Sequence, residues 1–142
     1  MRRAMIDKIY LDASFFVALQ IKEHIFYQKA WKKINKSQSI KIYFSLFTLD
    51  EAIHVLKKYK LSKSKIIKIV KDKLINTNKS ILISYKDDKK TSLKYLNLWQ
   101  KYNLRPIDSV HLFLMKQHKI KTIATFDNDF IKNKKQPGIK VL

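Results

Sequence analysis

Short apolar runs alternate with longer stretches of helical periodicity along the whole chain. The runs are rich in Ile, Tyr and Phe, and their length is typical of buried strands. Five strands are predicted, at residues 6–11, 40–45, 80–85, 122–126 and, as an edge strand, 139–142. Between them, apolar residues recur at every third or fourth position, which predicts amphipathic helices.

Seven helices are predicted in the intervening segments. Four have both ends defined by the apolar periodicity, at residues 13–19, 23–35, 46–60 and 107–117. Polar residues mark the starts of two more helices. Ser62 is predicted to cap a helix that reaches residue 74, and Asp87 is predicted to cap a helix that reaches residue 99. Pro106 suits the first turn of the helix at 107–117, and a short helix is expected from Asn128.

Strands that alternate with helices predict an α/β fold with a parallel sheet. We expect three layers, α/β/α, around a central and mostly parallel sheet of four to five strands. No linker or repeat divides the sequence, so residues 1–142 are predicted to form a single domain. In such open sheets, functional residues collect at the carboxyl ends of the strands.

Composition narrows the function classes. The 142 residues carry 31 Lys+Arg against 11 Asp+Glu, and the net charge of +20 suggests a polyanionic partner such as nucleic acid. Only three of these bases are arginine, and the lysines are spread along the chain, so a compositional bias is the alternative. The absence of cysteine excludes disulfides and Cys-ligated metals. The single glycine, Gly138, excludes Gly-rich phosphate loops.

Neither a membrane span nor a signal peptide is predicted. No apolar run approaches the length of about 18 residues that a spanning helix needs. Residues 1–5, Met-Arg-Arg-Ala-Met, lack the apolar region and the cleavage site of a signal peptide. We therefore expect an intracellular, cytoplasmic protein without a membrane partner.

Four of the scarce acids fall at the predicted functional edge of the sheet. Asp12 ends the first strand and Asp127 follows the fourth. Glu51 lies in the helix after the second strand, and Asp108 lies in the first turn of the helix that Pro106 begins. Carboxylates brought this close repel one another unless a cation compensates.

A hard divalent cation, Mg²⁺ or Mn²⁺, takes oxygen ligands of this kind. Held there, it can activate water and neutralise the charge that develops on a phosphodiester. Surrounding lysines would bind the polyanionic substrate. An acidic centre with a basic surround is the arrangement that a metal-dependent nuclease requires.

Each acid also has an ordinary structural interpretation. Asp12, Asp127 and Asp129 all stand where a helix begins and could serve only as caps. Asp108 could serve only the helix macrodipole. Glu51 could be an exposed residue beside Asp50; adjacent helical residues point about 100° apart, so only one of the two can face the site.

Four motifs, in this order, resemble the PIN domain family over essentially the whole chain. They are Tyr10-Leu11-Asp12-Ala13-Ser14, Leu49-Asp50-Glu51-Ala52, Ile107-Asp108-Ser109-Val110-His111 and Thr125-Phe126-Asp127-Asn128-Asp129. The resemblance implies a compact α/β nuclease fold. It also implies Mg²⁺- or Mn²⁺-dependent endonuclease activity on single-stranded or structured RNA.

The resemblance also implies which residues form the site and which partners the protein has. It implies that Asp12, Glu51, Asp108 and Asp127 are catalytic and hold the metal, with Ser14 and Thr125 as supporting hydroxyls. Asp129 is a supporting acid or an alternative ligand. Many small members are VapC-like toxins paired with an antitoxin protein, and others process ribosomal RNA. A homodimer is expected on the same ground.

Other residues near the motifs have less specific interpretations. Arg105 could contact a phosphate or an antitoxin carboxylate, or could be a solvated surface base. His54 and His111 could act as general bases, although a packing or surface role is more common for a histidine in a helix. The aromatic side chains of Phe15, Phe16, Phe113 and Trp99 are predicted to be core residues.

Two functions outside this nuclease class remain open. A catalytically silent module that binds RNA or protein fits the charge, although it gains nothing from carboxylates beside phosphate. A phosphoryl-handling α/β protein fits less well, because the first strand ends Asp12-Ala13-Ser14 rather than in paired acids or Asp-x-Asp.

Overall fold

The computed structural model describes residues 7–36, 39–132 and 138–142. A five-stranded sheet lies at its centre, with strand order β3-β2-β1-β4-β5 and every neighbouring pair parallel. The strands are β1 (Asp7–Leu11), β2 (Ile40–Phe44), β3 (Ser80–Leu82), β4 (Thr122–Ala124) and β5 (Lys140–Val141). The predicted parallel α/β sheet is therefore confirmed, with slightly shorter strands.

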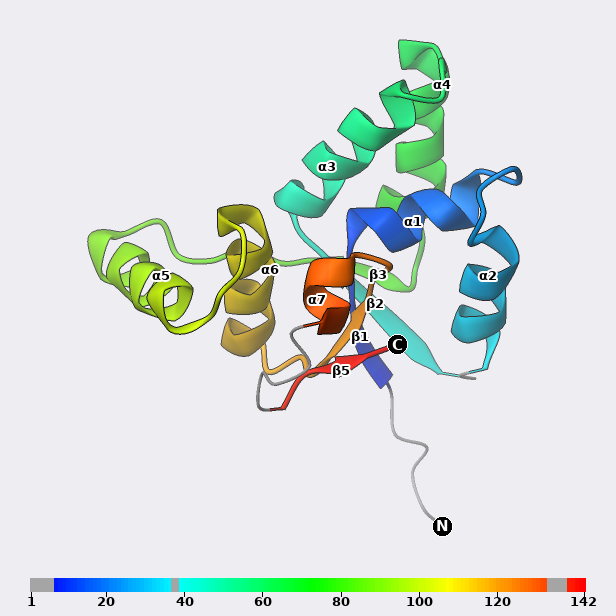
Figure 1. Cartoon of the computed structure of the whole chain (residues 1–142). Helices are drawn as coiled ribbons and strands as arrows, with labels where there is room; N and C mark the ends of the chain where they lie inside the picture. The colour runs from blue at the N-terminus through cyan, green and yellow to red at the C-terminus, as the bar shows by residue number, and fades with distance from the viewer. Residues whose placement is uncertain (1–6, 37–38, 133–137) are drawn as a thin grey trace.

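Helices connect the strands in chain order (Figure 1). They are α1 (Ala13–Gln20), α2 (Tyr27–Asn35), α3 (Leu46–Lys57), α4 (Lys63–Val70), α5 (Lys89–Lys101), α6 (Pro106–Gln117) and α7 (Asn128–Lys132). A π-helical turn, Lys71–Ile75, continues α4. Within the described part of the chain, no helix has both the length and the apolar character to cross a bilayer.

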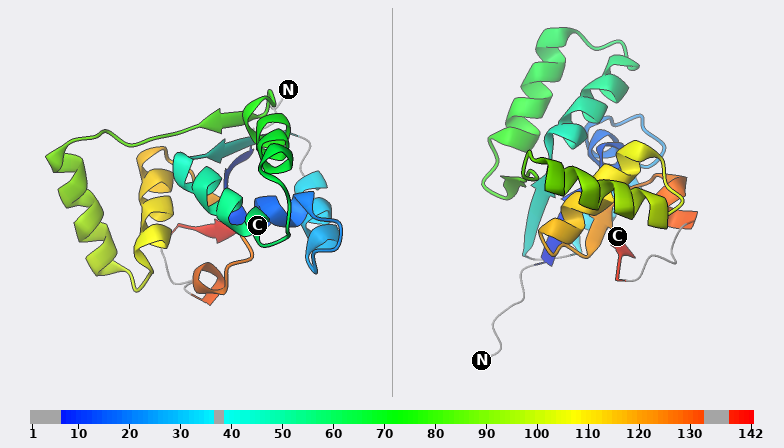
Figure 2. Two further views of the ribbon diagram at one scale, coloured as in Figure 1. Left: turned by 90° about the horizontal axis from the view of Figure 1, so that it is seen from above. Right: turned by 90° about the vertical axis from the view of Figure 1, so that its left-hand side faces the viewer.

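Alternation along β1 creates two cores, one on each face of the sheet. Ile9 and Leu11 point into a core that α1, α3 and α4 complete, whereas Tyr10 points into a second core completed by α6. Viewed from above, the sheet separates α5 and α6 from α1, α2 and α4 (Figure 2). This arrangement confirms the three-layer α/β/α architecture.

Local sequence accounts for several helix starts. Ser45 and Thr48 form a capping box at the N-terminus of α3, each side chain accepting a hydrogen bond from the other's backbone N–H. Ser62 caps α4, as predicted, by accepting a hydrogen bond from Lys65 N. Pro106 occupies the first turn of α6, where its missing N–H costs nothing.

Three sequence-based predictions are wrong in detail. Asp88, not Asp87, caps α5, accepting a hydrogen bond from Thr91 N. Residues 23–26 form turns rather than the start of a helix, because the backbone folds back at His24 before α2 begins. Trp99 is 44% exposed rather than part of the core. The reason is that α5 packs on the outer side of α6, away from the sheet, and buries no residue fully (Figure 1).

Candidate active site

The carboxyl ends of β1 and β4 bring together side chains that are far apart in the sequence. Asp12 directly follows β1, and Asp127 lies in the loop between β4 and α7. Because β1 and β4 are neighbours in the sheet, these two loops are adjacent. Glu51 comes from α3 and Asp108 from the first turn of α6, both of which begin at this edge.

Hydroxyl groups fix the carboxylate of Asp12, which is only 4% exposed. Its Oδ2 accepts hydrogen bonds from Ser14 Oγ at 2.8 Å and from Thr125 Oγ1 at 2.6 Å. The Asp12 side chain makes no cap hydrogen bond to α1, although the residue occupies the cap position. A capping role does not explain this residue, and Ser14 and Thr125 both support it.

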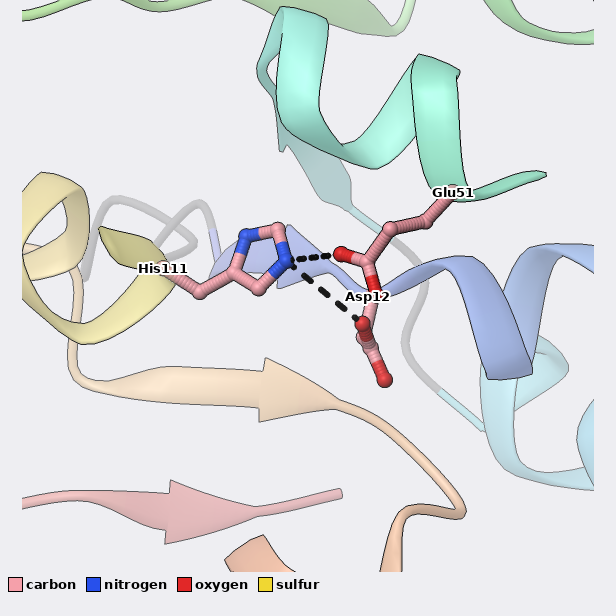
Figure 3. A group of neighbouring side chains, drawn as sticks. All are labelled: Asp12, Glu51 and His111. Atoms are coloured by element: carbon pink, nitrogen blue, oxygen red, sulfur yellow. Dashed lines mark hydrogen bonds and ion pairs between the residues drawn. The ribbon is translucent and has the colours of Figure 1, made fainter. Parts of the chain in front are cut away.

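A chain of hydrogen bonds runs from Tyr10 through His111 to Glu51. The hydroxyl of Tyr10 lies 2.5 Å from Nδ1 of His111, and Nε2 of the same ring is hydrogen-bonded to Glu51 Oε1. The Asp12 Oδ1 atom lies 4.0 Å from Nε2 (Figure 3). Asp12, Glu51 and His111 thus form one group of side chains that point toward one another.

Tyr10 and Glu51, at the two ends of this hydrogen-bond chain, set the donor and acceptor roles along it. Burial raises the pKa of Tyr10, so its hydroxyl keeps its proton. The Tyr10 oxygen also lies 2.8 Å from Ser45 Oγ and 3.3 Å from Thr48 Oγ1, and the Thr48 hydroxyl lies nearer still, at 3.1 Å, to the carbonyl oxygen of Leu11. A carboxylate only accepts hydrogen bonds, so Nε2 of His111 is the donor to Glu51.

Arg105 joins the remaining acids into a second group. Its guanidinium contacts Asp108 Oδ2 at 2.9 Å, Asp127 Oδ2 at 2.6 Å and Asp129 Oδ2 at 3.3 Å. The Arg105 side chain is 55% exposed, as a solvated surface base would be, but it is paired with three carboxylates. Asp127 also accepts a hydrogen bond from Asp129 N on Oδ1, so it caps α7 in addition to pairing with Arg105.

Burial raises the pKa of Asp108, which is 1% exposed. The ion pair with Arg105 opposes this shift, whereas the negative charges of Asp127 and Asp12 add to it. Arg105 therefore offsets only part of the cost of gathering carboxylates here. The pKa of Arg105 rises in turn, chiefly through its hydrogen bond to Asp108.

An open pocket of about 500 Å³ lies against this edge. Asp12, Glu51, Arg105 and Asp127 all line it, so three of the four predicted acids face one space. Asp50 is exposed and lines a different hollow, beside Phe47 and Asp87. Of the two adjacent acids in α3, Glu51 is the one that faces the site.

The donor set fits a divalent cation. Two groups of three side chains, Asp12–Glu51–His111 and Asp108–Asp127–Asp129, each bring ligand atoms within 4.8 Å of one another. Most of these ligand atoms are carboxylate oxygens, which suit Mg²⁺ or Mn²⁺. A cation would also relieve the excess negative charge that surrounds Asp108.

Two residues, His111 and Tyr10, contact the site more directly than their sequence patterns indicate. His111 is fully buried and contacts the site directly, and its position three residues after Asp108 on α6 was the available signal, because that spacing places both on one helix face. Tyr10 carried no such signal, since a Tyr within an apolar strand has the pattern of an ordinary core residue.

Fold and site together define an α/β protein with an acidic cluster at the carboxyl edge of a parallel sheet. A family model of the PIN domain matches residues 9–136, so the chain belongs to the PIN domain family. A search of curated proteins gives no match.

Solved structures with the same fold cover nearly all of the chain. One is VapC20 of Mycobacterium tuberculosis, described as a sarcin–ricin loop cleaving toxin (TM-score 0.69, 15% identity, 89% of this chain and 95% of that chain). Another is a toxin–antitoxin complex from Klebsiella pneumoniae (0.64, 18%, 93% and 95%). A third is VapBC2 of Rickettsia felis bound to a promoter DNA fragment (0.63, 17%, 95% and 97%). At these identities, the similarity establishes the fold.

Proposed function

We propose that this protein is a metal-dependent endoribonuclease. The observation that carries the proposal is the convergence of Asp12, Glu51 and Asp127 on one pocket, with Asp108 buried behind Arg105 at the same edge. Acids this scarce in the sequence are not needed together for stability, and burial makes their proximity costly. A site that holds a cation against a phosphodiester accounts for them.

Each side chain has a task that follows from its contacts. Asp12 presents Oδ1 to the pocket because Ser14 and Thr125 occupy Oδ2. His111 directs a donor at Glu51 and thereby orients its carboxylate. Asp108 and Asp127 share the guanidinium of Arg105, which would have to move or re-pair when a cation enters.

The cation, Mg²⁺ or Mn²⁺, would be held by Asp12, Glu51, Asp108 and Asp127, with Asp129 as an alternative ligand. When bound, it supplies a Lewis acid that stabilises negative charge on the phosphate in the transition state. The lysine-rich surface supplies long-range attraction for the RNA backbone.

Asp12→Asn and Asp108→Asn test the proposal. Each should abolish cleavage of single-stranded RNA in Mn²⁺ while the far-UV circular dichroism stays that of the wild type. Asp50→Asn, on the exposed face of α3, is the matched control and should cleave normally. Wild-type protein that cuts no RNA in Mg²⁺ or Mn²⁺ would contradict the proposal.

Similarity in fold to VapC20 and to two toxin–antitoxin complexes supports a toxin role. The expected partners are then RNA, a cognate antitoxin protein and a second copy of the chain. Growth arrest on expression, relieved by a small protein encoded next to this one, would support that role. RNA cleavage without arrest would favour the alternative of a ribosomal-RNA-processing enzyme.

The non-enzymatic alternative is a catalytically silent module that binds RNA or protein. The carboxylates of Asp12, Glu51 and Asp127 argue against it, because a binder of polyanions would be weakened by carboxylates in its pocket. Thermal unfolding with Mg²⁺ or Mn²⁺ separates the two functions. No stabilisation by either ion would favour the silent module.

A further inference from the structure

Three phenylalanine rings form a continuous stack beside the acidic site. Phe126 lies in the middle, with its ring centroid 5.0 Å from Phe15 at an interplanar angle of 8° and 4.5 Å from Phe26 at 17°. Phe15 is fully buried, whereas Phe26 and Phe126 are half-buried and line the same 500 Å³ pocket as Asp12 and Asp127. The buried Phe15 closes the stack at one end, and at the other end Phe26 lies beside the tilted ring of His24, with centroids 5.9 Å apart and an interplanar angle of 42°.

The position of this stack is tied to the carboxylates by the backbone. Phe126 lies between Thr125, which donates a hydrogen bond to Asp12, and Asp127 itself. Its own N–H donates to Ser14 Oγ at 3.0 Å. An aromatic group held on Phe26 would therefore lie at a fixed place relative to the acidic site.

Basic side chains lie beside Phe26, at the end of the stack that faces the pocket. Lys29 Nζ lies 5.8 Å from the centroid of the Phe26 ring. His24 Nδ1 accepts a hydrogen bond from Phe26 N at 3.0 Å, which leaves Nε2 as the donor atom of this ring. His24 also lines the pocket.

One face of α3 lines the pocket and carries both an acidic residue of the site and basic residues. Glu51, His54 and Lys58 all line the pocket, at spacings of three and four residues along the helix. Lys58 lies seven positions after Glu51, which is about 10 Å along the helix axis. A phosphate held at Lys58 and a phosphodiester held at the acids would thus lie on one strand that runs along this face of α3.

We infer that Phe26 is the stacking platform for an unpaired base next to the scissile phosphodiester and that Lys58 binds the flanking phosphate. This inference rests on the proposed nuclease function and assigns residues of this chain to the binding of an unpaired base and of a phosphate. A fourth ring on Phe26 extends the existing stack, and aromatic stacking accepts any base. A paired base is excluded, because its faces are covered by its neighbours in the duplex.

Binding measured without turnover tests the platform. In full-length protein carrying Asp12→Asn, fluorescence anisotropy compares labelled oligouridylate with an abasic ribose-phosphate chain of the same length. The added substitution Phe26→Leu should weaken oligouridylate binding about 10-fold and leave binding of the abasic chain unchanged. Phe26→Tyr should restore the preference for bases, and Ile25→Ala, at a neighbouring residue that is 85% exposed, should not alter it.

Lys57 and Lys58 provide a matched pair for the phosphate contact, since both are exposed and only Lys58 lines the pocket. Lys58→Gln should reduce the slope of log affinity against log salt by about 0.7, as expected for one lost contact to a single strand. Lys57→Gln should leave the slope unchanged.

Two results would overturn the inference. One is that Phe26→Leu weakens the binding of oligouridylate and of the abasic chain equally, which would mean that the ring only supports the fold. The other is that Phe26→Leu weakens the binding of neither oligomer, which would mean that no base stacks on Phe26. These outcomes do not depend on cleavage, so they are distinguishable from a failure of wild-type protein to cut RNA.

Discussion

His111 and Glu51, separated by 60 positions in the sequence, share a hydrogen bond at the centre of the acidic site. The opposite ring nitrogen is held by Tyr10, so the imidazole is fixed from both sides. Replacing His111 with Leu should therefore leave Glu51 free to rotate. We expect affinity for Mn²⁺ to fall about 10- to 100-fold, the usual effect of removing a group that orients a metal ligand.

Isothermal titration calorimetry with Mn²⁺ measures this effect. His118→Leu is the control, because His118 follows the same helix but bonds the carbonyl oxygen of Ser84, outside the acidic site. Metal affinity that is equal in His111→Leu and in the wild type would contradict an orienting role.

Thr125 links two of the acids through one hydroxyl. That hydroxyl donates to Asp12 Oδ2 at 2.6 Å and accepts from Asp127 N at 2.9 Å, and the residue is 1% exposed. Thr125→Val preserves the shape but leaves a buried carboxylate and a backbone N–H without this partner. The free energy of unfolding should fall by about 1–3 kcal/mol in urea denaturation.

Thr122→Val is the control for Thr125→Val, because Thr122 begins strand β4, which ends just before Thr125, and is half-buried and outside the site. It should change stability by less than about 0.5 kcal/mol. If both variants lost the same stability, the loss would come from the strand itself rather than from the contacts to Asp12 and Asp127.

Much of this site could be predicted from the sequence, for a definite physical reason. Parallel strands bring their carboxyl ends to one edge, so the acids after β1 and β4 had to meet once the βα order was read. Helical phase then favoured Glu51 over Asp50, since Leu49, Ala52, Ile53 and Leu56 mark the inward face of α3.

What the sequence could not predict depends on side-chain direction and on packing between helices. Arg105 pairs with Asp108, Asp127 and Asp129, but nothing in its sequence context separates that role from a solvated one. The periodicity of α5 predicts a buried apolar face. That helix packs mainly on α6, so Leu93, Leu96 and Trp99 stay largely exposed.

Arg105 occupies the carboxylates that a cation would use. A guanidinium and a metal ion compete for the oxygens of Asp108 and Asp127, so removing the guanidinium should tighten metal binding. We expect Arg105→Gln to lower the Kd for Mn²⁺ several-fold, measured by calorimetry at constant ionic strength. Lys101→Gln, a matched loss of one exposed positive charge, should have no such effect, and a weaker Kd in Arg105→Gln would contradict competition.

Asp108 makes stability depend on pH in a direction opposite to that of a salt-bridged surface acid. Burial raises its pKa, so between its ordinary pKa and the raised one the folded state binds more protons than the unfolded state. The free energy of unfolding therefore falls as pH rises through that window. At neutral pH the ionised carboxylate is a net cost to the fold.

Asp108→Asn removes this cost, so in EDTA it should unfold at a higher temperature than the wild type at pH 7. The difference should disappear near pH 3, where Asp108 is protonated in both states. Asp50→Asn, exposed on α3, should show no gain at pH 7. A variant less stable than the wild type at pH 7 would mean that the ion pair with Arg105 outweighs the cost of burial.

Lys119 adopts a backbone conformation that glycine usually takes. Its φ is 56°, and the N–H groups of Lys119 and Ile120 bond to the carbonyl oxygens of Lys116 and Met115 at the end of α6. This is a Schellman motif with a side chain at its left-handed position, in a chain with only one glycine.

Lys119→Gly should relieve the contact between Cβ and backbone at that position. After allowance for the greater freedom of glycine in the unfolded chain, we expect a gain of about 0.5–1 kcal/mol in the free energy of unfolding. Lys94→Gly, at an exposed position inside α5, should instead lose about 1 kcal/mol. Urea denaturation distinguishes the two signs, and a loss at both positions would show that the left-handed conformation carries no strain to relieve.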